Sequence, residues 1–448
     1  MASAAEQLAQ NINFRSFAKA TELKKRIWFT LAALVVYRLG TYIPVPGIDP
    51  VALDRIFQQQ SQGMLGMFDM FSGGSLGRMT IFALSIMPYI SAAIIMQLLT
   101  AVSPTLEQLK KEGETGRKKI NQYTRYGTVG LAAVQAYGIA VGLEGMNAPG
   151  GGSAVIDPGL FFRFVTVVTL TGGTIFLMWL GEQITQRGVG NGISLIIFSG
   201  IVANLPSAFA STMELGRTGA LSTGVIVGIL VMAVAVIAFI VFVERAQRRL
   251  IVQYPKRQVG NKMFGGENSH LPIKLNSSGV IPLIFASSLL LMPLTVAGFS
   301  GQGGPDWLTT VTALLGRGQP LYLGLYVSLI VFFAFFYTSI VFNPDDTAEN
   351  LKKNGGFIPG IRPGRNTSNY INYVLMRLTT VGAIYLALVA ILPEILVARY
   401  NVPFYFGGTS LLIVVSVTMD TVQQVQSYLL AHQYEGLIRK SKLKGRRS

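Results

Sequence analysis

The stretch ALSTGVIVGILVMAVAVIAFIVFV (220–243) contains no charged residue, and the basic segment ERAQRR (244–249) follows it directly. A helix that crosses a bilayer needs about 20 mostly apolar residues, because its backbone amides find hydrogen-bond partners only within the helix itself. The stretch meets this requirement. It therefore predicts a transmembrane helix that ends at a basic loop.

Nine more stretches share this length and apolar character. Charged residues make up only 13% of the 448-residue chain, against about 25% in soluble domains, and the mean hydropathy is +0.47. We therefore expect an all-α polytopic membrane protein with ten transmembrane helices. The further spans are predicted at 25–43, 79–103, 124–143, 160–181, 188–209, 276–298, 319–343, 374–396 and 403–425.

The loop charges predict the orientation of these spans. Of the 37 Lys and Arg residues, 30 fall in alternate segments, which begin with the N-terminal tail and end with the C-terminal tail. Arg38 lies inside the first span, and the intervening segments hold six bases: Arg55, Arg78, Arg163, Arg217, Arg317 and Arg399. Because cytoplasmic loops carry an excess of Lys and Arg, both termini are predicted to be cytoplasmic.

The first span also contains residues typical of a membrane interface. Arg38 lies near its outer end, where a long side chain can reach the lipid headgroups. Trp28, Tyr37 and Tyr42 flank the span, and we expect them in the interfacial aromatic belt.

The spans and loops divide the chain into segments. The order is a cytoplasmic tail (1–24), six spans (25–243), a cytoplasmic loop (244–274), spans seven and eight (275–343), a second cytoplasmic loop (344–373), spans nine and ten (374–425) and a basic cytoplasmic tail (426–448). The ten spans also form two halves, spans one to five and spans six to ten. An odd number of spans per half gives the halves opposite orientations, so any structural repeat between them is inverted.

Several kinds of site are excluded by composition and motifs. The chain has no cysteine, which excludes disulfides, zinc–thiolate sites and cysteine nucleophiles. His270 and His432 fall in predicted cytoplasmic segments, and no HExxH, GxSxG or GxxxxGK(S/T) motif occurs. We therefore expect no enzyme activity, cofactor or metal. The net charge of +16 reflects membrane topology better than nucleic-acid binding, because the bases are confined to short blocks between apolar runs.

The segment GMLGMFDMFSGGSLGR (63–78), just before the second span, is rich in Met and Gly. Four of its large apolar residues follow the i, i+3, i+4, i+7 spacing of one helix face: Met64, Met67, Phe68 and Phe71. The run is too short to cross a bilayer, and Gly73 and Gly74 end it. The pattern fits either a re-entrant segment that acts as a mobile stopper or an amphipathic helix on the outer leaflet.

Six isoleucines are spaced so that they could form a ring across a pore. Two pairs in the second and fifth spans lie one helical turn apart, on one helix face, and the seventh and tenth spans supply one each. The set is Ile86, Ile90, Ile193, Ile197, Ile284 and Ile413. Branched apolar side chains would exclude water and ions from a pore yet part around a wide solute. The alternative is that these residues, like most isoleucines in spans, face lipid or neighbouring helices.

Two predicted loops, 244–274 and 343–366, are basic, rich in Gly and Pro, and longer than simple connections. Long loops often carry function. Docking of a large anionic partner, such as an RNA-containing particle or an acidic motor surface, would explain both their length and their charge. The alternative is that the positive-inside rule alone accounts for the charge.

Long motifs extend from the first span to the tail. They are IPVPGID (43–49), MFDMFSGGSLGR (67–78), IFALSIMPYISAAIIMQLL (81–99), LKKEGETGRKKINQYTRYGT (109–128), FLMWLGEQITQRGVGNGISLIIFSGIV (176–202), SHLPIKLNSSGVIPLIFASS (269–288), NLKKNGGFIPGIRPG (350–364) and VPFYFGGTSLLIVVSV (402–417). Together they resemble the SecY/Sec61 family of protein-conducting channels in its bacterial form. The resemblance implies an hourglass pore between two inverted five-helix halves, with a lateral gate that opens to lipid.

The resemblance also implies a function and site residues. The implied function is that of the pore-forming subunit of the Sec translocon, which passes unfolded secretory polypeptides across the membrane and releases transmembrane segments sideways. The six isoleucines match the pore ring, and the segment near 63–74 matches the plug, with Met64, Leu65, Met67, Phe68, Met70 and Phe71. Gln97 and Asn191 match polar positions near the lateral gate. Arg257, Lys262 and Arg362 match positions that dock a motor or the ribosome, although the family often has two arginines at Asn261 and Lys262.

The implied partners are SecE-like and SecG-like small membrane subunits, a SecA-type motor ATPase, the ribosome, signal sequences, nascent polypeptides and anionic lipids. The implied location is the bacterial inner membrane.

The residues alone leave two other functions open. A secondary transporter predicts a charged or polar site at mid-membrane, for which Asp420, near the end of the tenth span, is a poor candidate. A membrane scaffold or insertase predicts neither a plug nor an isoleucine ring.

Overall fold

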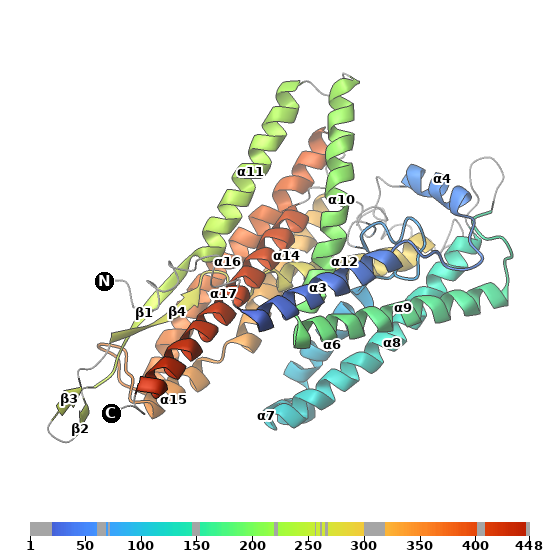
Figure 1. The fold of residues 1–448 in the computed structure, drawn as a ribbon. Helices are drawn as coiled ribbons and strands as arrows, with labels where there is room; N and C mark the ends of the chain where they lie inside the picture. Colours follow the sequence, from blue (N-terminus) through green and yellow to red (C-terminus); the bar gives the residue numbers. More distant parts are fainter. Residues whose placement is uncertain are drawn as a thin grey trace. The chain divides into compact units, whose positions relative to one another are not determined.

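The structure is a computed structural model, drawn as a ribbon in Figure 1. It describes residues 20–60, 69, 72–145, 153–218, 223–255, 257–259, 262–264, 268–299, 319–400 and 408–444. Most of these residues are helical, as the sequence predicts. The chain forms two compact units: one combines Met1–Phe209, Leu291–Ala313 and Val417–Ser448, and the other combines Ala210–Leu290 and Leu314–Ser416.

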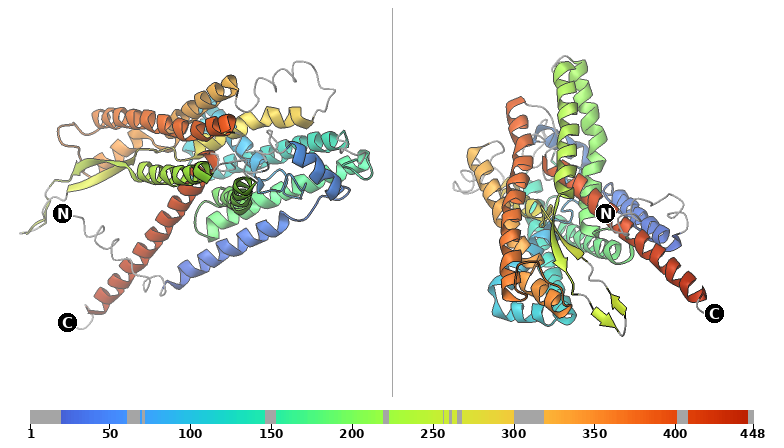
Figure 2. Two further views of the ribbon diagram at one scale, coloured as in Figure 1. Left: turned by 90° about the horizontal axis from the view of Figure 1, so that it is seen from above. Right: turned by 90° about the vertical axis from the view of Figure 1, so that its left-hand side faces the viewer.

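The first unit consists of packed helices. Its elements are α3 (Thr21–Gly40), α4 (Pro50–Gln60), α6 (Met87–Val102), α7 (Pro104–Lys111), α8 (Glu114–Glu144), α9 (Leu160–Arg187), the first part of α10 (Gly192–Arg217), the last part of α12 (Ile281–Phe299) and the last part of α17 (Gly408–Lys444). Helices α8 and α9 pack side by side (Figure 1; Figure 2, left), α6 packs on α8, and α3 packs on α9. The predicted spans one to four are therefore direct neighbours in this unit.

Glycines allow close approach of two pairs of segments. A Cβ at Gly173 of α9 would overlap the backbone oxygen of Ile81, and a Cβ at Gly192 of α10 would overlap the backbone oxygen of Gly181. No larger residue fits at either position without a shift of the backbone. Small residues at such contacts are typical of membrane proteins, in which close packing replaces the hydrophobic effect between helices.

Each of the ten predicted spans coincides with a helix over most of its length. By length and apolar character, six of the described helices are able to cross a membrane. A seventh is added if α6 and α7, which are bent by 97° at their junction, count as one broken span. The architecture is that of a polytopic helical protein, and the number of ten transmembrane helices stays a prediction.

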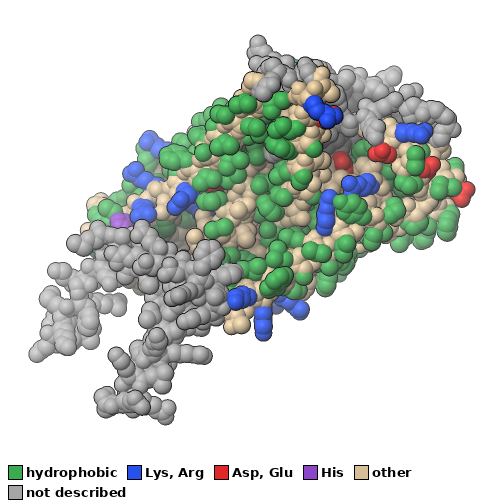
Figure 3. Space-filling view, turned by 45° about the horizontal axis from the view of Figure 1, so that its top comes forward, with side chains coloured by type: hydrophobic (Ala, Val, Ile, Leu, Met, Phe, Trp, Pro, Cys, Tyr) green, Lys and Arg blue, Asp and Glu red, His purple; other side chains and the backbone are tan. Residues whose placement is uncertain are grey.

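The surface of these helices carries many apolar side chains. Figure 3 shows hydrophobic side chains over much of the face in view. Trp28, Phe161 and Phe242 are each more than two-thirds exposed, at 71%, 81% and 74%. Soluble monomers rarely expose apolar areas this broad, so lipid is the solvent that fits this surface.

The second span begins later than the sequence predicts. Helix is predicted from residue 79, but α6 begins at Met87. Before it, Met79 (φ 45°) and Ser85 (φ 51°) adopt the left-handed backbone conformation, which interrupts a right-handed helix. Pro88 then occupies the first turn of α6, where its missing N–H needs no helical partner.

The second unit combines helices with two β-hairpins. Its elements are the last part of α10, α11 (Thr223–Arg245), β1 (Gln247–Gln253), β2 (Arg257–Val259), β3 (Lys262–Phe264), β4 (Asn268–Lys274), the first part of α12 (Ile281–Phe299), α14 (Pro320–Val341), α15 (Pro344–Lys353), α16 (Arg365–Tyr400) and the first part of α17. Strands β1 and β4 pair antiparallel, with Gln247 opposite Lys274 and Gln253 opposite Asn268. Strands β2 and β3 form a second, shorter antiparallel pair.

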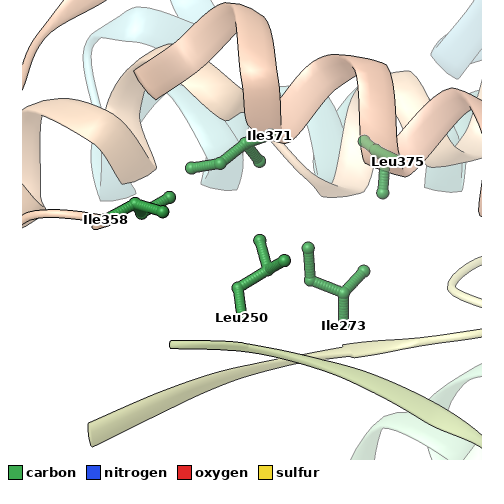
Figure 4. Packing of buried hydrophobic residues seen from close by; sticks show 5 residues of the cluster. All are labelled: Leu250, Ile273, Ile358, Ile371 and Leu375. Carbon is green, nitrogen blue, oxygen red and sulfur yellow. The ribbon is translucent and has the colours of Figure 1, made fainter. Parts of the chain in front are cut away.

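A small apolar core joins the first of the two predicted loops to the second. It consists of five buried side chains from β1, β4, the segment before α16 and α16 itself (Figure 4): Leu250, Ile273, Ile358, Ile371 and Leu375. The backbones of Gln253 and Phe357 also pair across the two loops, with hydrogen bonds of 2.8 and 2.9 Å. The two loops thus form one folded structure, which we call the β-platform (β1, β4, α15 and residues 357–375).

Candidate functional site

The segment predicted to be a plug is described only at its end. The side chains predicted to fill the pore lie outside the described residues: Met64, Leu65, Met67, Phe68, Met70 and Phe71. Asp69 and residues 72–78 are described, and hydrogen bonds join them into one turn. We call residues 69 and 72–78 the hinge turn, because they connect the predicted plug to the second span.

Asp69 organises the hinge turn. Its Oδ1 atom accepts a hydrogen bond from the N–H of Gly77 at 2.7 Å, and its backbone oxygen accepts one from the N–H of Gly74 at 2.9 Å. The hydroxyl of Ser72 donates to the same backbone oxygen at 3.0 Å. Burial raises the pKa of the Asp69 carboxyl above its ordinary value, while the hydrogen bonds from Gly77 and Ser72 and the nearby Arg78 act in the opposite direction. The loss of solvation on burial is thus the largest of the effects on the pKa of this carboxyl.

Two glycines give the hinge turn its backbone conformation. The φ angles of Gly73 and Gly74 are +70° and +82°, in the left-handed region that glycine adopts without steric cost. A Cβ at Gly73 would also lie 2.9 Å from the Cα of Gly200 in α10. Ser72 and Ser75, on either side of the pair, are fully buried. The described backbone therefore leaves the helical conformation at Gly73, where the sequence predicts the end of the half-helix.

Two adjacent residues of α3 hydrogen-bond to the hinge turn. Arg38 Nη1 donates to the backbone oxygen of Gly73 at 2.8 Å, and the Tyr37 hydroxyl donates to the backbone oxygen of Ser72 at 3.4 Å. The interfacial position predicted for Tyr37 is wrong, because its side chain is fully buried and its ring stacks on Phe82, with centroids 6.0 Å apart. Arg38 likewise bonds to a protein carbonyl, whereas the sequence predicts that its side chain reaches the lipid headgroups.

A tyrosine joins two arginines beside the hinge turn. The hydroxyl of Tyr42 accepts a hydrogen bond from Arg38 Nη2 at 3.2 Å. The guanidinium carbons of Arg38 and Arg78 lie 5.1 and 4.5 Å from the Tyr42 ring centroid, within the range of cation–π interactions. The end of α3 and the end of the hinge turn are therefore held by the same aromatic ring.

The six isoleucines of the predicted ring are divided between the two units. Those in the first unit are Ile86, Ile90, Ile193 and Ile197, and those in the second are Ile284 and Ile413. All except Ile193 are buried. Ile193 is half-buried, and a Cβ at Gly181 of α9 would lie 3.3 Å from its Cγ1 atom. The ring that the sequence indicates stays a prediction.

The two predicted polar residues of the lateral gate have different surroundings. Gln97 in α6 is half-buried, and its Oε1 atom has no hydrogen-bond partner among the described residues. Asn191 is exposed, and its Oδ1 atom accepts a hydrogen bond from the N–H of Ile193 at 3.1 Å, at the start of α10. The turn before Asn191 is anchored by hydrogen bonds from the Val189 N–H to Thr30 and from the Gly190 N–H to Gln424.

The predicted docking residues belong to the β2–β3 hairpin and to the β-platform. Arg257 and Lys262 lie in β2 and β3, and the structure describes their backbone but not their side chains. Arg362 is exposed in the turn before α16. Its backbone oxygen accepts a hydrogen bond from the Thr367 hydroxyl at 3.0 Å. Because Ile358 and Ile361 pack into the core of the β-platform, the turn that carries Arg362 is fixed to this structure.

Within the described part of the chain, no group of three His, Asp or Glu side chains is placed to hold a metal ion. Ion pairs instead join neighbouring helices: Arg125 of α8 and Glu182 of α9 form two hydrogen bonds of 2.9 and 2.6 Å. The distinctive chemistry of the site is an anchored glycine hinge beside apolar helices.

Sequence comparison identifies the relatives of the chain. Residues 80–422 match the SecY family. The chain is 55% identical to the protein translocase subunit SecY of Rickettsia conorii, over 98% of this chain and 100% of that protein. It is 56% identical to the protein translocase subunit SecY of Escherichia coli K12, over 95% of this chain and 96% of that protein.

Structure comparison finds the same fold. A protein-conducting channel matches with a TM-score of 0.65 and 18% sequence identity, over 91% of this chain and 92% of that chain. A SecY protein whose plug domain is described as stabilising the closed state and maintaining a membrane seal matches with a TM-score of 0.62 and 19% identity. Sec61 in a canine ribosome–channel complex matches with a TM-score of 0.63 and 17% identity. From the sequence matches and the shared fold, this chain belongs to the SecY family.

Proposed function

We propose that this chain is the pore-forming subunit of a Sec translocon. It passes unfolded secretory polypeptides across the membrane and releases transmembrane segments sideways into lipid. The observation that carries the proposal is the match to translocase subunits over nearly the whole chain. The anchored hinge turn supports it, because a movable segment needs a defined joint and a defined resting place.

The proposed pore is closed by the isoleucine ring and by the plug. A narrow ring of branched apolar side chains excludes water, so ions meet a large desolvation barrier there. The ring still parts around an extended polypeptide because it is held by packing alone. The plug domain of a related SecY protein is described as maintaining a membrane seal, and residues 63–74 would have this role here.

The lateral gate is proposed to open between spans two/three and seven/eight. A nascent transmembrane helix leaves through it because lipid is a better solvent for its apolar side chains than a water-filled pore. Gln97 and Asn191 are the polar residues assigned to this gate. The buried Gln97 oxygen without a described partner is a feature that a movable helix contact would show.

The β-platform and the β2–β3 hairpin are proposed as the docking surface for the partners that drive transport. Sec61 is known in a ribosome–channel complex, which supports a ribosome as one partner. A SecA-type motor ATPase is the other, and SecE-like and SecG-like subunits complete the assembly. Signal sequences, nascent polypeptides and anionic lipids are the remaining partners. Arg257, Lys262 and Arg362 would contact the docked ribosome or motor. The chain itself is not an enzyme.

The proposed location is the inner membrane of a bacterium, with both termini and the β-platform on the cytoplasmic side. The asymmetric distribution of Lys and Arg supports this orientation. It places the docking surface where ribosomes and a motor ATPase work. The hinge turn then lies toward the opposite side of the membrane.

Ion conductance of the purified channel complex in a planar bilayer tests the proposed function. We expect the intact complex to conduct little and a complex lacking residues 64–73 to leak ions, because the deletion removes the plug and its glycine joint. A complex with Ile384→Ala, a change at an exposed position of α16, is the control and should stay closed. Silence of the deletion variant, even with a motor and a signal peptide present, would contradict a plugged pore and favour a scaffold.

A further inference from the structure

Arg38 lies in a segment of α3 that is otherwise uncharged from Ile27 to Gly40. A charged side chain within a membrane helix is costly unless protein groups solvate it. Here its two terminal nitrogens have separate partners: Nη1 donates to the Gly73 oxygen at 2.8 Å, and Nη2 donates to the Tyr42 hydroxyl at 3.2 Å. The tyrosine ring also lies under the guanidinium, which fixes the direction of the side chain.

The carbonyl that accepts from Arg38 belongs to the joint of the hinge turn. Gly73 has a left-handed backbone (φ +70°), and its Cα faces Gly200 of α10 so closely that a Cβ would lie 2.9 Å from the Gly200 Cα. The joint is therefore seated between α3 and α10. On one side, the Arg38 side chain donates a hydrogen bond to the joint. On the other side, the joint packs against the backbone of α10 at Gly200.

The bonds inside the hinge turn differ in kind from the bond to Arg38. Gly74 and Gly77 both donate hydrogen bonds to Asp69, so these bonds are kept if the turn moves as a unit. The bonds from Tyr37 and Arg38 join the turn to another helix, and they must break when the turn leaves its seat. At 2.8 Å and with a charged donor, the Arg38 bond is the stronger of these two.

From this geometry we propose that Arg38 is a positioning residue that latches the hinge turn, and with it the plug, in the closed position. Opening of the channel then requires rupture of the bond between Arg38 Nη1 and the Gly73 oxygen. This inference rests on the proposed function, because it assigns the closing contact of the same plug. It gives a role to an intramembrane charge that the pore ring and the docking surface leave unused.

The first measurement is ion conductance of the assembled complex with Arg38→Met. Methionine keeps an apolar stem of similar length but removes the donors, so we expect the leak through the closed channel to rise about tenfold or more, as the loss of a charged hydrogen bond implies. Arg217→Met is the matched control. It removes an arginine that is also predicted on the non-cytoplasmic side, but its exposed side chain pairs with Glu214 of the same helix and lies outside the hinge turn. Its leak should stay at the level of the intact channel.

The second measurement reports on the hinge turn itself. The chain has no cysteine, so Ser75→Cys introduces a single thiol at a fully buried position of the turn. In this background, Arg38→Met should raise the rate at which a membrane-impermeant maleimide labels the thiol about tenfold, whereas Arg217→Met should not. A general loss of packing is distinguished by the Tm of the complex, which should be alike in the two variants.

The outcomes of these experiments distinguish a failure of the proposed latch from a failure of the proposed function. If the deletion of 64–73 leaks but Arg38→Met neither leaks nor raises thiol labelling, the latch is wrong and the plugged pore stands. If neither variant leaks, the proposed function itself fails. If Arg38→Met does not assemble, Arg38→Gln decides, because its shorter neutral amide cannot make the charge-assisted bond; labelling at the rate of the intact turn would overturn the proposal.

Discussion

Asp69 places a carboxyl group inside the hinge turn, where burial raises its pKa. A raised pKa in the folded protein means that protonation favours the folded state. Stability contributed by Asp69 therefore rises as the pH falls through this raised pKa toward the ordinary value of 3.8. At pH values above the raised pKa, the carboxyl is ionised, and the folded state bears the full free-energy cost of burying this charge.

This linkage predicts the behaviour of Asp69→Asn. At about pH 7 the variant should be at least as stable as the unaltered protein, because the amide oxygen still accepts the hydrogen bond from Gly77 and no charge is buried. The difference between the two Tm values should shrink as the pH is lowered. Thermal unfolding of the purified complex between about pH 8 and pH 4 measures it.

Asp69→Leu is the control for this experiment. It removes the acceptor and leaves the N–H of Gly77 without its bond, so it should lower the Tm at every pH. If Asp69→Asn instead had a lower Tm than the unaltered protein at about pH 7, and this deficit disappeared on acidification, the carboxylate would be stabilising the turn, contrary to the direction of its pKa.

At the scale of elements, two segments that look like separate loops in the sequence fold together. The β1–β4 ribbon and the turn before α16 share one apolar core and a backbone pairing between Gln253 and Phe357. The residues of this core are spread over more than 100 positions of the sequence. Each of the two segments alone has too few apolar residues to form a core that excludes water. The β-platform exists only because the two segments cover each other.

The core of the β-platform gives a second prediction. Ile371→Ala removes a fully buried side chain and should destabilise this structure by about 2–5 kcal/mol. Ile384→Ala is a matched control on the same helix, since its side chain is 56% exposed, and it should have little effect. Protease susceptibility of the 244–274 segment measures the loss, and ribosome co-sedimentation should weaken with it. Equal protease sensitivity of the two variants would show that the apolar core does not hold the platform together.

At the scale of the whole molecule, the residues of the proposed isoleucine ring are divided between the two units of the chain. Four of its members belong to the first unit and two to the second. A seal of this kind depends on every member, because water enters wherever one apolar side chain is shortened. The proposed ring and the proposed latch involve different residues, so we expect damage to each to be measurable by itself.

Ile90→Ala tests the ring. The smaller side chain should widen the constriction and raise the ion conductance of the plug-deleted channel (without residues 64–73) several-fold, since dewetting depends steeply on pore width. Ile95→Ala is the control: it lies in the same helix, but its side chain is 42% exposed. Single-channel recordings compare Ile90→Ala with Ile95→Ala in the channel that lacks residues 64–73. Without the plug, the conductance reports on the ring alone. If both substitutions changed the conductance equally, Ile90 would not line the pore.

The sequence by itself determined the class of the protein. Long uncharged stretches have one stable arrangement in lipid, the hydrogen-bonded helix, and loop charge predicts orientation, so both can be read without knowing any contact. The joint at Gly73 was likewise predictable, because a glycine pair ends a helix through local backbone preference. The family motifs supplied the candidate ring, plug and docking residues, which spacing alone left open.

The tertiary structure decided which partners individual side chains have. Tyr37 and Arg38 both suit a membrane interface by residue type, yet one is fully buried on Phe82 and the other bonds to Gly73, 35 positions further along. The segment before α6 pairs its backbone with residues 43–45, and the two loops join into the β-platform, so both also depend on contacts distant in sequence. Local propensity cannot encode such choices, because the energy of each comes from a neighbour that only the folded chain brings near.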